Sequence, residues 1–272
     1  MDKKLRILFV TTEIDPFLKM SSAADLIRLL PQKLQEKGHE IRIFMPKFGV
    51  INERRNRLHE VVRLSGINIR VAGEEKPLTI KVASIPNAKL QVYFLDNEDY
   101  FKRKSVLTDP SSEKFHMDND ERSIFFCKGV IETVKKLGWP PDIIHCHDWM
   151  TSFIPLYLRT NYQDDPMFNN TKTVFTVYNN GFDSSLDENY LEKVRVDGIA
   201  DETLDNYKGN NYVGVVKGGM AMSDVVTMGA PTIDAKLEEY IEQTQPEKYY
   251  FDSSDKDSYV EGYHQLYSTI AN

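Results

Sequence analysis

The chain opens with an apolar run that leads through a loop without glycine into a helical pattern. Residues 5–10 (LRILFV) are short, apolar and partly β-branched, which predicts a buried strand, and residues 23–37 have the apolar spacing of a helix. The connecting residues, 11–22 (TTEIDPFLKMSS), contain no glycine. In a doubly wound sheet such a connection lies at the carboxyl edge, where ligands bind. This loop is therefore the first candidate site.

Strand and helix patterns alternate along the rest of the chain, which predicts an α/β fold with a doubly wound, mostly parallel, Rossmann-like sheet. Further strands are expected at 41–45, 143–146, 174–178 and 225–228, and further helices at 120–137, 151–159 and 232–243. Residues 58–95 differ, because short alternating runs there predict an inserted antiparallel meander.

The domain organisation follows from the same pattern. Residues 1–245 are expected to form one Rossmann-like domain, and residues 246–272 a tail whose helix, from about 256, packs back on that domain. Residues 179–210 are polar and poorly periodic, which predicts a loop with a short helix at the ligand edge.

Charge, hydropathy and cysteine positions limit the cellular location and the classes of binding partner that we expect. The 272 residues include 41 acidic and 34 basic side chains, a net charge of -7, which argues against nucleic acid as a partner. No apolar run approaches the roughly 20 residues of a membrane span, so no membrane partner is expected. Cys127 and Cys146 lie in apolar segments, and the first residues lack a signal-peptide pattern. We expect buried thiols and a cytoplasmic protein.

Lys19 is the cation of the first loop. A flexible ammonium near a helix start can neutralise a phosphate. The alternative, favoured by the local pattern, is a solvated lysine, with Ser21 or Ser22 serving only to cap the helix.

A second cluster, His145-Cys146-His147-Asp148-Trp149, ends a predicted strand. Two histidines and a cysteine are compatible with zinc, but alternate strand residues point to opposite faces and no complementary ligand pair occurs elsewhere, so no metal is expected. We expect His145 to be a core histidine, whereas His147 and Asp148 should be exposed to ligand, with Trp149 at the same edge.

A third cluster begins at Asp118, just before the predicted helix 120–137. Carboxylates at that position suit the helix dipole. Helix capping and binding of sugar hydroxyls are equally compatible with the sequence.

Taken together, these segments resemble the amino-terminal domain of the glycogen and starch synthases. The matching runs occur in family order: residues 12–19 (TEIDPFLK) with Asp25, 30–31 (LP), 38–41 (GHEI), 45–48 (MPKF), 92–97 (VYFLDN), 118–119 (DN) with Arg122, 141–149 (PDIIHCHDW) and 174–179 (VFTVYN). One such motif is weak, but an ordered series is typical of common ancestry. The resemblance reaches from the first strand to about Leu237.

The resemblance implies one half of a two-domain glycosyltransferase-B fold. In this family, glucose passes from ADP-glucose, or UDP-glucose in some members, to the non-reducing end of an α-1,4-glucan with retention of configuration. No cofactor is implied; the nucleotide sugar is a possible donor substrate. The implied substrate-binding residues are Lys19, Asp25, Asp118, His147, Asp148, Trp149 and Asn179, and no catalytic residue is assigned. The roughly 35 residues after Leu237 are too few for a second such domain.

Three departures from the family pattern affect the site. The family's Lys-Thr-Gly-Gly-Leu is Lys19-Met20-Ser21-Ser22-Ala23 here, so both glycines that allow close approach of a diphosphate are replaced. The family's histidine that contacts the transferred sugar is replaced here by Met150, which cannot donate the same hydrogen bond. A second family histidine is replaced by Tyr178.

The replaced site residues and the missing second domain favour a glucan-binding or regulatory module that has little activity alone. An active glucosyltransferase completed by a partner chain or a homodimer is the alternative, motivated by the retained Lys19 and Asp118. An unrelated Rossmann-like binding protein is a third possibility, but the chain has no dinucleotide fingerprint to support it.

Overall fold

A computed structural model describes residues 3–196, 198–244 and 249–271. In these residues the strands are β1 (Arg6–Val10), β2 (Glu40–Pro46), β3 (His59–Glu60), β4 (Ile67–Val71), β5 (Glu74–Ser84), β6 (Gln91–Asp96), β7 (Ile143–His147), β8 (Lys172–Val177), β9 (Val225–Met228) and β10 (Tyr249–Tyr250). They form one sheet in the order β10-β9-β8-β7-β1-β2-β6-β5-β3, with β4 paired to β5.

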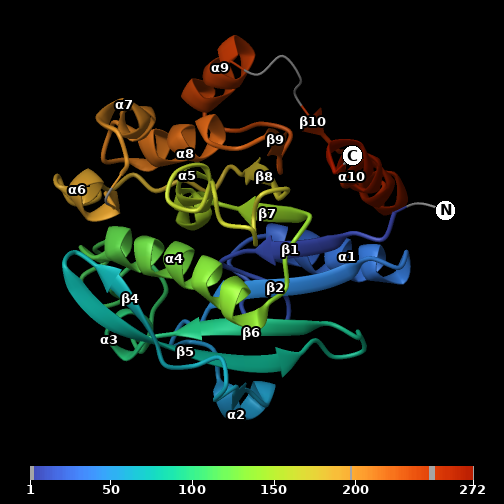
Figure 1. The fold of residues 1–272 in the computed structure, drawn as a ribbon, viewed down its shortest axis with the longest axis horizontal. Coiled ribbons are helices and arrows are strands. Elements are labelled where there is room, and N and C mark those ends of the chain that lie inside the picture. Colours follow the sequence, from blue (N-terminus) through green and yellow to red (C-terminus); the bar gives the residue numbers. More distant parts are fainter. Residues whose placement is uncertain (1–2, 197, 245–248, 272) are drawn as a thin grey trace.

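The helices connect these strands and cover both faces of the sheet (Figure 1). They are α1 (Ala23–Glu36), α2 (Glu53–Asn56), α3 (Glu98–Phe101), α4 (Asn119–Leu137), η1 (Trp149–Thr151), α5 (Phe153–Arg159), α6 (Tyr190–Val194), α7 (Asp201–Leu204), η2 (Asp205–Tyr207), α8 (Tyr212–Ala221), α9 (Ala235–Thr244) and α10 (Lys256–Ile270). The single short helix expected within 179–210 is in fact three short helical segments, α6, α7 and η2.

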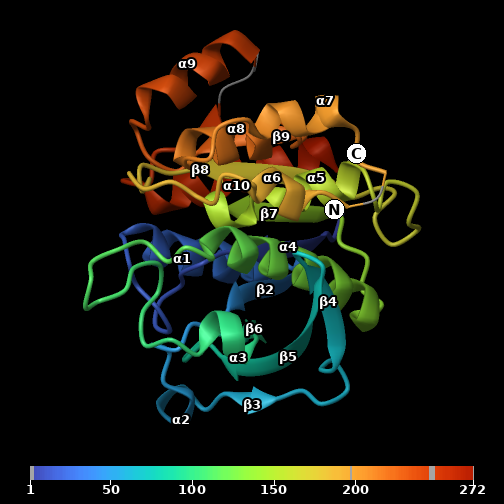
Figure 2. The same cartoon turned by 90° about the vertical axis from the view of Figure 1, so that its left-hand side faces the viewer.

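The central sheet is parallel from β10 through β6, whereas β5 pairs antiparallel with β6, β3 and β4. Ile7 to Val10 of β1 are completely buried, because helices cover both faces. The parallel strands all end at one edge, which Figure 2 shows toward the viewer. This arrangement confirms the predicted α/β fold class with its antiparallel insertion.

The last helix returns to the first elements of the chain. Lys37, just after α1, pairs with Glu261 of α10 at 2.9 Å, and Lys3 donates to the Ala271 carbonyl at 3.1 Å. These contacts place α10 beside α1 (Figure 1). The expected domain boundary at 245/246 lies outside the described residues.

A buried chain of hydrogen bonds ties α10 to three parallel strands. His145 of β7 bonds to the Tyr267 hydroxyl through Nδ1 at 2.6 Å and to Thr176 Oγ1 of β8 through Nε2 at 2.5 Å. Thr176 contacts Thr227 of β9 at 2.6 Å, and the Tyr263 hydroxyl donates to Thr227 at 3.2 Å. All five side chains are buried, which confirms His145 as a core histidine.

Removing the Tyr267 hydroxyl should destabilise this arrangement. In Tyr267→Phe, the buried Nδ1 of His145 loses its partner, which should lower the free energy of unfolding by about 1–3 kcal/mol. Urea denaturation at neutral pH measures the loss. Tyr250→Phe is the matched control, because Tyr250 is 39% exposed. Equal stability of the two variants would contradict the structural role of the network.

Candidate functional site

The candidate site lies where β1, β7 and β8 end side by side. Their register pairs Val10 with Cys146 and His147 with Thr176, so the loops that follow the three strands meet at one edge of the sheet (Figure 2). Thr12 of the first loop reaches the Asp148 carboxylate at 3.5 Å, and the Asp148 N–H donates to the Thr176 carbonyl at 3.3 Å. The fold thus brings the first two sequence clusters together.

Asp148 has an unusual backbone and a buried carboxylate. Its φ of 74° and ψ of 166° fall in a region that is otherwise nearly restricted to glycine, so the surrounding contacts hold a strained residue in place. The carboxylate accepts the Trp149 N–H at 2.6 Å and a hydrogen bond from the side chain of Asn180. Burial raises the pKa of Asp148 to about 7, although these hydrogen bonds oppose the shift.

The predicted exposure of His147 and Asp148 is wrong. Asp148 is 8% exposed and His147 only 1%. His147 lies on the same strand face as His145, where its ring stacks on Phe9 and its Nδ1 bonds to the Tyr178 hydroxyl at 2.8 Å. Burial lowers the pKa of His147 to about 3, so the ring is neutral. Its Nε2 has no hydrogen-bond partner among the described residues.

The first loop is organised around a buried carboxylate that the sequence reading did not single out. Glu13 accepts hydrogen bonds from the Met20 N–H at 2.6 Å, the Ser21 N–H at 2.8 Å and the Ser21 hydroxyl at 2.5 Å. Ser21 Oγ also accepts the Ala23 N–H at 3.1 Å, which gives Ser21 a capping role at α1. The amides that precede α1 are therefore occupied by the chain's own Glu13.

Lys19 and Asp25 form a surface ion pair. The ammonium lies 2.6 Å from Asp25 Oδ2, and the side chains are 53% and 55% exposed. The hydrogen bond to Asp25 raises the pKa of Lys19. In this conformation Lys19 is a solvated lysine, and any role toward a phosphate requires Asp25 to release it.

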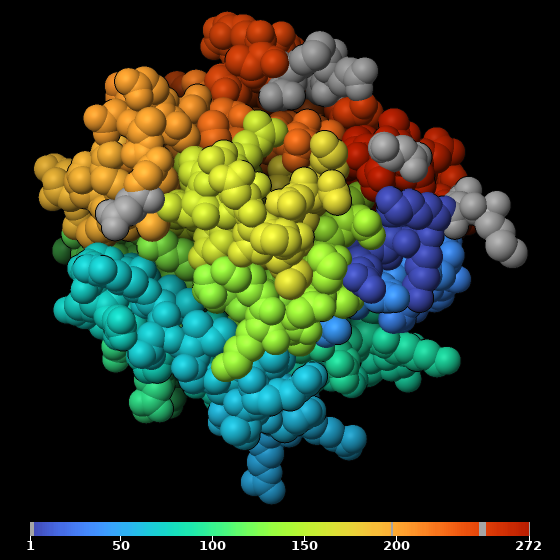
Figure 3. Space-filling view, viewed as in Figure 1, coloured from blue at the N-terminus to red at the C-terminus, as the bar shows by residue number. Residues whose placement is uncertain are grey.

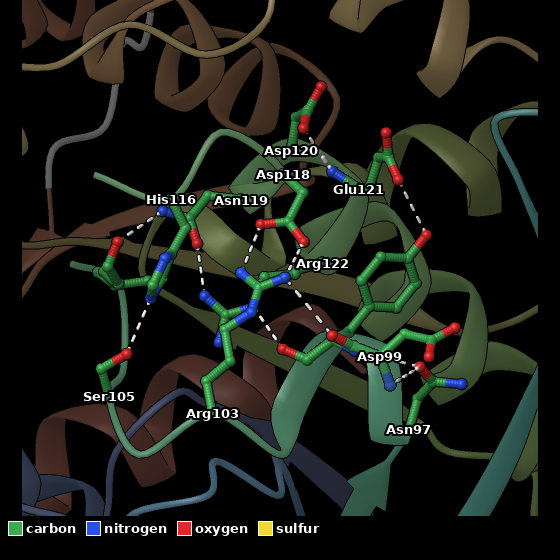
Figure 4. Close-up of polar contacts among 12 residues, drawn as sticks. Asn97, Asp99, Arg103, Ser105, His116, Asp118, Asn119, Asp120, Glu121 and Arg122 are labelled. Carbon is green, nitrogen blue, oxygen red and sulfur yellow. Dashed lines mark hydrogen bonds and ion pairs between the residues drawn. The ribbon is translucent and has the colours of Figure 1, made fainter. Parts of the chain in front are cut away.

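Asp118 immediately precedes α4 but does not cap it with its side chain. Instead its carboxylate is clasped by Arg103, whose Nη1 lies 2.7 Å from Oδ1 and whose Nη2 contacts Oδ2 (Figure 4). Burial acts to raise the pKa of Asp118, but the hydrogen bonds from Arg103 prevail and lower it. The Arg103–Asp118 ion pair joins the two ends of the loop 102–118. The Asp118 side chain therefore does not cap α4, and its binding of sugar hydroxyls stays a prediction.

Arg122 is fully buried beneath the same loop. Its guanidinium donates to Asn119 Oδ1 at 2.5 Å (Figure 4). It also donates to the Tyr100 carbonyl at 2.8 Å and to the Val106 carbonyl at 2.6 Å. Burial lowers the pKa of Arg122 to about 10. Arg122 thus acts as an internal anchor of the loop, which explains its place in the 118–122 motif.

A polar pocket of about 530 Å³ opens beside the end of β8. It is lined by Asn179, Asn180, Gly181, Phe182, Asp183, Asn211, Tyr212, Val213, Asp234 and Lys236. Asn179 is exposed there, whereas Asn180 Oδ1 is buried and lacks a partner in the described part of the chain. Such an unsatisfied acceptor is costly unless a ligand or water donates to it.

Trp149 lies beneath this pocket and does not line it. Its ring is 1% exposed and contacts the Phe182 ring with centroids 4.9 Å apart. Phe182 is only partly buried, so it offers an aromatic surface to the pocket, whereas Trp149, which was expected at the ligand edge, does not. The sequence reading missed Asn180 and Phe182, although the polar turn directly after strand 174–178 is the signal that marks them.

Within 3–196, 198–244 and 249–271, no three His, Cys, Asp or Glu side chains lie together as potential metal ligands. None of the helices described is both long and apolar enough to cross a membrane.

Asp148→Asn should change the pH dependence of stability. The folded-state pKa of Asp148 lies above its ordinary value, so the stability that this group contributes is present at low pH and is lost as the pH rises toward 7. Between pH 5 and 8 the wild type should lose about 2.5 kcal/mol through this group, and Asp148→Asn should not. Urea unfolding at each pH measures this, with the exposed Asp183→Asn as control. Parallel curves for wild type and Asp148→Asn would contradict the assignment.

Comparison with known proteins identifies the family. The family model for the starch synthase catalytic domain matches residues 6–243. The glycogen synthase of Chlorobium phaeobacteroides is 47% identical over 177 residues, which are 65% of this chain and 36% of that protein. That of Chlorobium limicola is 39% identical over 225 residues, 83% of this chain and 45% of that protein. The chain therefore spans less than half the length of these relatives.

A solved structure supports the fold. The catalytic domain of Starch Synthase IV from Arabidopsis thaliana, bound to ADP and acarbose, superimposes with a TM-score of 0.75 over 91% of this chain and 51% of that one, at 21% identity. This likeness agrees with one half of a glycosyltransferase-B fold. On the family match and the identity to the glycogen synthases, the chain belongs to the starch synthase catalytic domain family.

Proposed function

We propose that this domain binds an α-1,4-glucan at the carboxyl edge of its sheet and transfers little glucose by itself. The observation that carries the proposal is the pocket beside β8, where the buried Asn180 Oδ1 lacks a partner among the described residues. A sugar hydroxyl is a donor of the kind this oxygen requires. The family assignment makes a glucan the natural source of that hydroxyl.

The remaining lining of the pocket also suits a neutral polyol. Asn179, Asn211 and Asp183 offer amide and carboxylate groups that exchange hydrogen bonds with hydroxyls, and Phe182 offers a partly exposed ring. One cation, Lys236, lines the pocket alongside two carboxylates, Asp183 and Asp234. The charge balance therefore favours an uncharged ligand over a phosphate.

The first loop supports low activity toward a nucleotide sugar. The amides of Met20 and Ser21 already donate to Glu13, and Lys19 is paired with Asp25. A diphosphate arriving at this loop would meet the Glu13 carboxylate and would have to displace these contacts. ADP-glucose or UDP-glucose thus lacks the prepared anion site that retaining transfer needs.

A working glucosyltransferase, completed by a partner chain or a homodimer, is the second candidate. Lys19 and Asp118 are retained, and the exposure of Lys19 leaves it accessible to a second chain. A cytoplasmic location is part of both candidates, and the two free, buried thiols of Cys127 and Cys146 agree with a reducing compartment.

Asn180→Ala should weaken glucan binding. Loss of the buried Oδ1 acceptor removes one hydrogen bond, and we expect about tenfold lower affinity for glycogen. Affinity electrophoresis in glycogen gels measures this as reduced retardation. Asn170→Ala is the matched control, because Asn170 is exposed on a different surface. Wild-type mobility equal to that of an inert protein would remove the proposal.

The transfer reaction separates the two candidates. Incorporation of labelled glucose from ADP-glucose or UDP-glucose into glycogen should not exceed the protein-free blank, because the loop amides are occupied by Glu13. The assay is run with the purified chain and with Lys19→Ala. Incorporation that Lys19→Ala abolishes would instead establish the glucosyltransferase.

A further inference from the structure

A second pocket, of about 510 Å³, lies away from the strand ends, between the β4–β5 turn, α4 and α6. Figure 3 shows this region on the left, where the cyan surface of β4 and β5 approaches the orange surface around α6. Among the described residues the lining is strongly basic: it contains Arg70, Lys128, Lys193 and Arg195 and one carboxylate, that of Glu192, together with Ala72, Gly73, Asn189 and Val196.

Two of these cations are already neutralised. Lys193 Nζ lies 3.0 Å from carboxylate oxygens of Asp120 and Glu121 and 3.3 Å from Asp187. Arg195 pairs with Asp201 at 2.6 Å and with Glu192 at 3.4 Å. These ion pairs hold the segment that follows Asn189 in place and form one wall of the pocket.

The other two cations have no counter-ion within the residues described. The Arg70 guanidinium makes no hydrogen bond or ion pair there, and Lys128 Nζ donates to the Arg70 carbonyl at 2.9 Å without reaching a carboxylate. The ammonium also lies over the Tyr157 ring, 5.4 Å from its centroid. Lys128 is thus fixed in position, with donors left for a ligand.

The neighbouring positive charges repel each other. Burial, and to a smaller extent the positive charge of Arg70, lowers the pKa of Lys128 to about 8. An anion between the two side chains would form charge-assisted hydrogen bonds to both and remove this repulsion. Its gain is greatest for a compact group with two negative charges, because each cation then faces one charge.

We infer that this pocket binds a phosphate monoester or free phosphate, held by Arg70 and Lys128. Asn189 and Glu192 lie on the opposite wall and can exchange hydrogen bonds with a polar group attached to the phosphate. The site is separate from the pocket beside β8, and it depends on neither glucan binding nor glucose transfer.

Isothermal titration calorimetry of the full chain tests this inference with inorganic phosphate and with glycerol 3-phosphate. Glycerol and sodium chloride at the same ionic strength serve as blanks. Binding of either phosphate, weakened about tenfold or more by Arg70→Gln and by Lys128→Met, supports the site. Tighter binding of glycerol 3-phosphate identifies a phosphate monoester, and tighter binding of inorganic phosphate identifies the free anion.

Matched variants keep the test decisive. Arg63→Gln removes an exposed arginine outside the pocket and should leave phosphate affinity unchanged. Lys128→Met keeps an unbranched side chain of similar length, and both pocket variants should unfold in urea at the wild-type midpoint, which shows that they are folded. Absence of phosphate binding by the wild type, or equal affinity in wild type, Arg70→Gln and Lys128→Met, would overturn the inference whatever the glycogen gels show.

Discussion

The buried chain of hydrogen bonds through Tyr267, His145, Thr176, Thr227 and Tyr263 fixes the part of the sheet from which the site is built. It joins β7, β8 and β9 to α10, all in surroundings where an unsatisfied polar group would be costly. Because these bonds fix the positions of the strand ends relative to one another, they also fix where the loops that follow the strands begin. Asp148 can therefore be kept in a backbone conformation that would relax in a looser setting.

Two buried carboxylates give this edge its character. The Glu13 carboxylate accepts hydrogen bonds from the loop that precedes α1. These bonds occupy the backbone amides that would otherwise be available to an anion. Asp148 accepts the Trp149 N–H, and the nearby Asn180, which lines the pocket beside β8, has a buried carbonyl oxygen without a partner among the described residues. We therefore propose neutral hydroxyls as the ligands of this edge, while Arg70 and Lys128, which have no counter-ion among the described residues, lie elsewhere on the domain. This distribution of charge is the reason for proposing separate surfaces for a sugar and for an anion.

The fold could be predicted from the sequence because its strands and helices carry strong local patterns: the runs at 41–45 and 143–146, for example, lie within β2 and β7. His145 was also predictable as a core residue. The burial of His147 could not be predicted, because it depends on contacts with Phe9 and Tyr178. Only the parallel pairing of the strands brings these residues beside His147. The position of Lys128 beside the Arg70 carbonyl likewise depends on how the inserted hairpin packs against α4, and no local sequence pattern contains that information.

The most direct test of glucan binding at this edge is to follow the side-chain amide of Asn180 by nuclear magnetic resonance during titration with maltohexaose. The Asn180 signal, assigned by comparison with the Asn180→Ala variant, should shift and saturate with the sugar, while the signal of the remote Asn170 stays unchanged. Saturable binding of maltohexaose that leaves the Asn180 signal in place would contradict the account, because the sugar would then occupy a different surface.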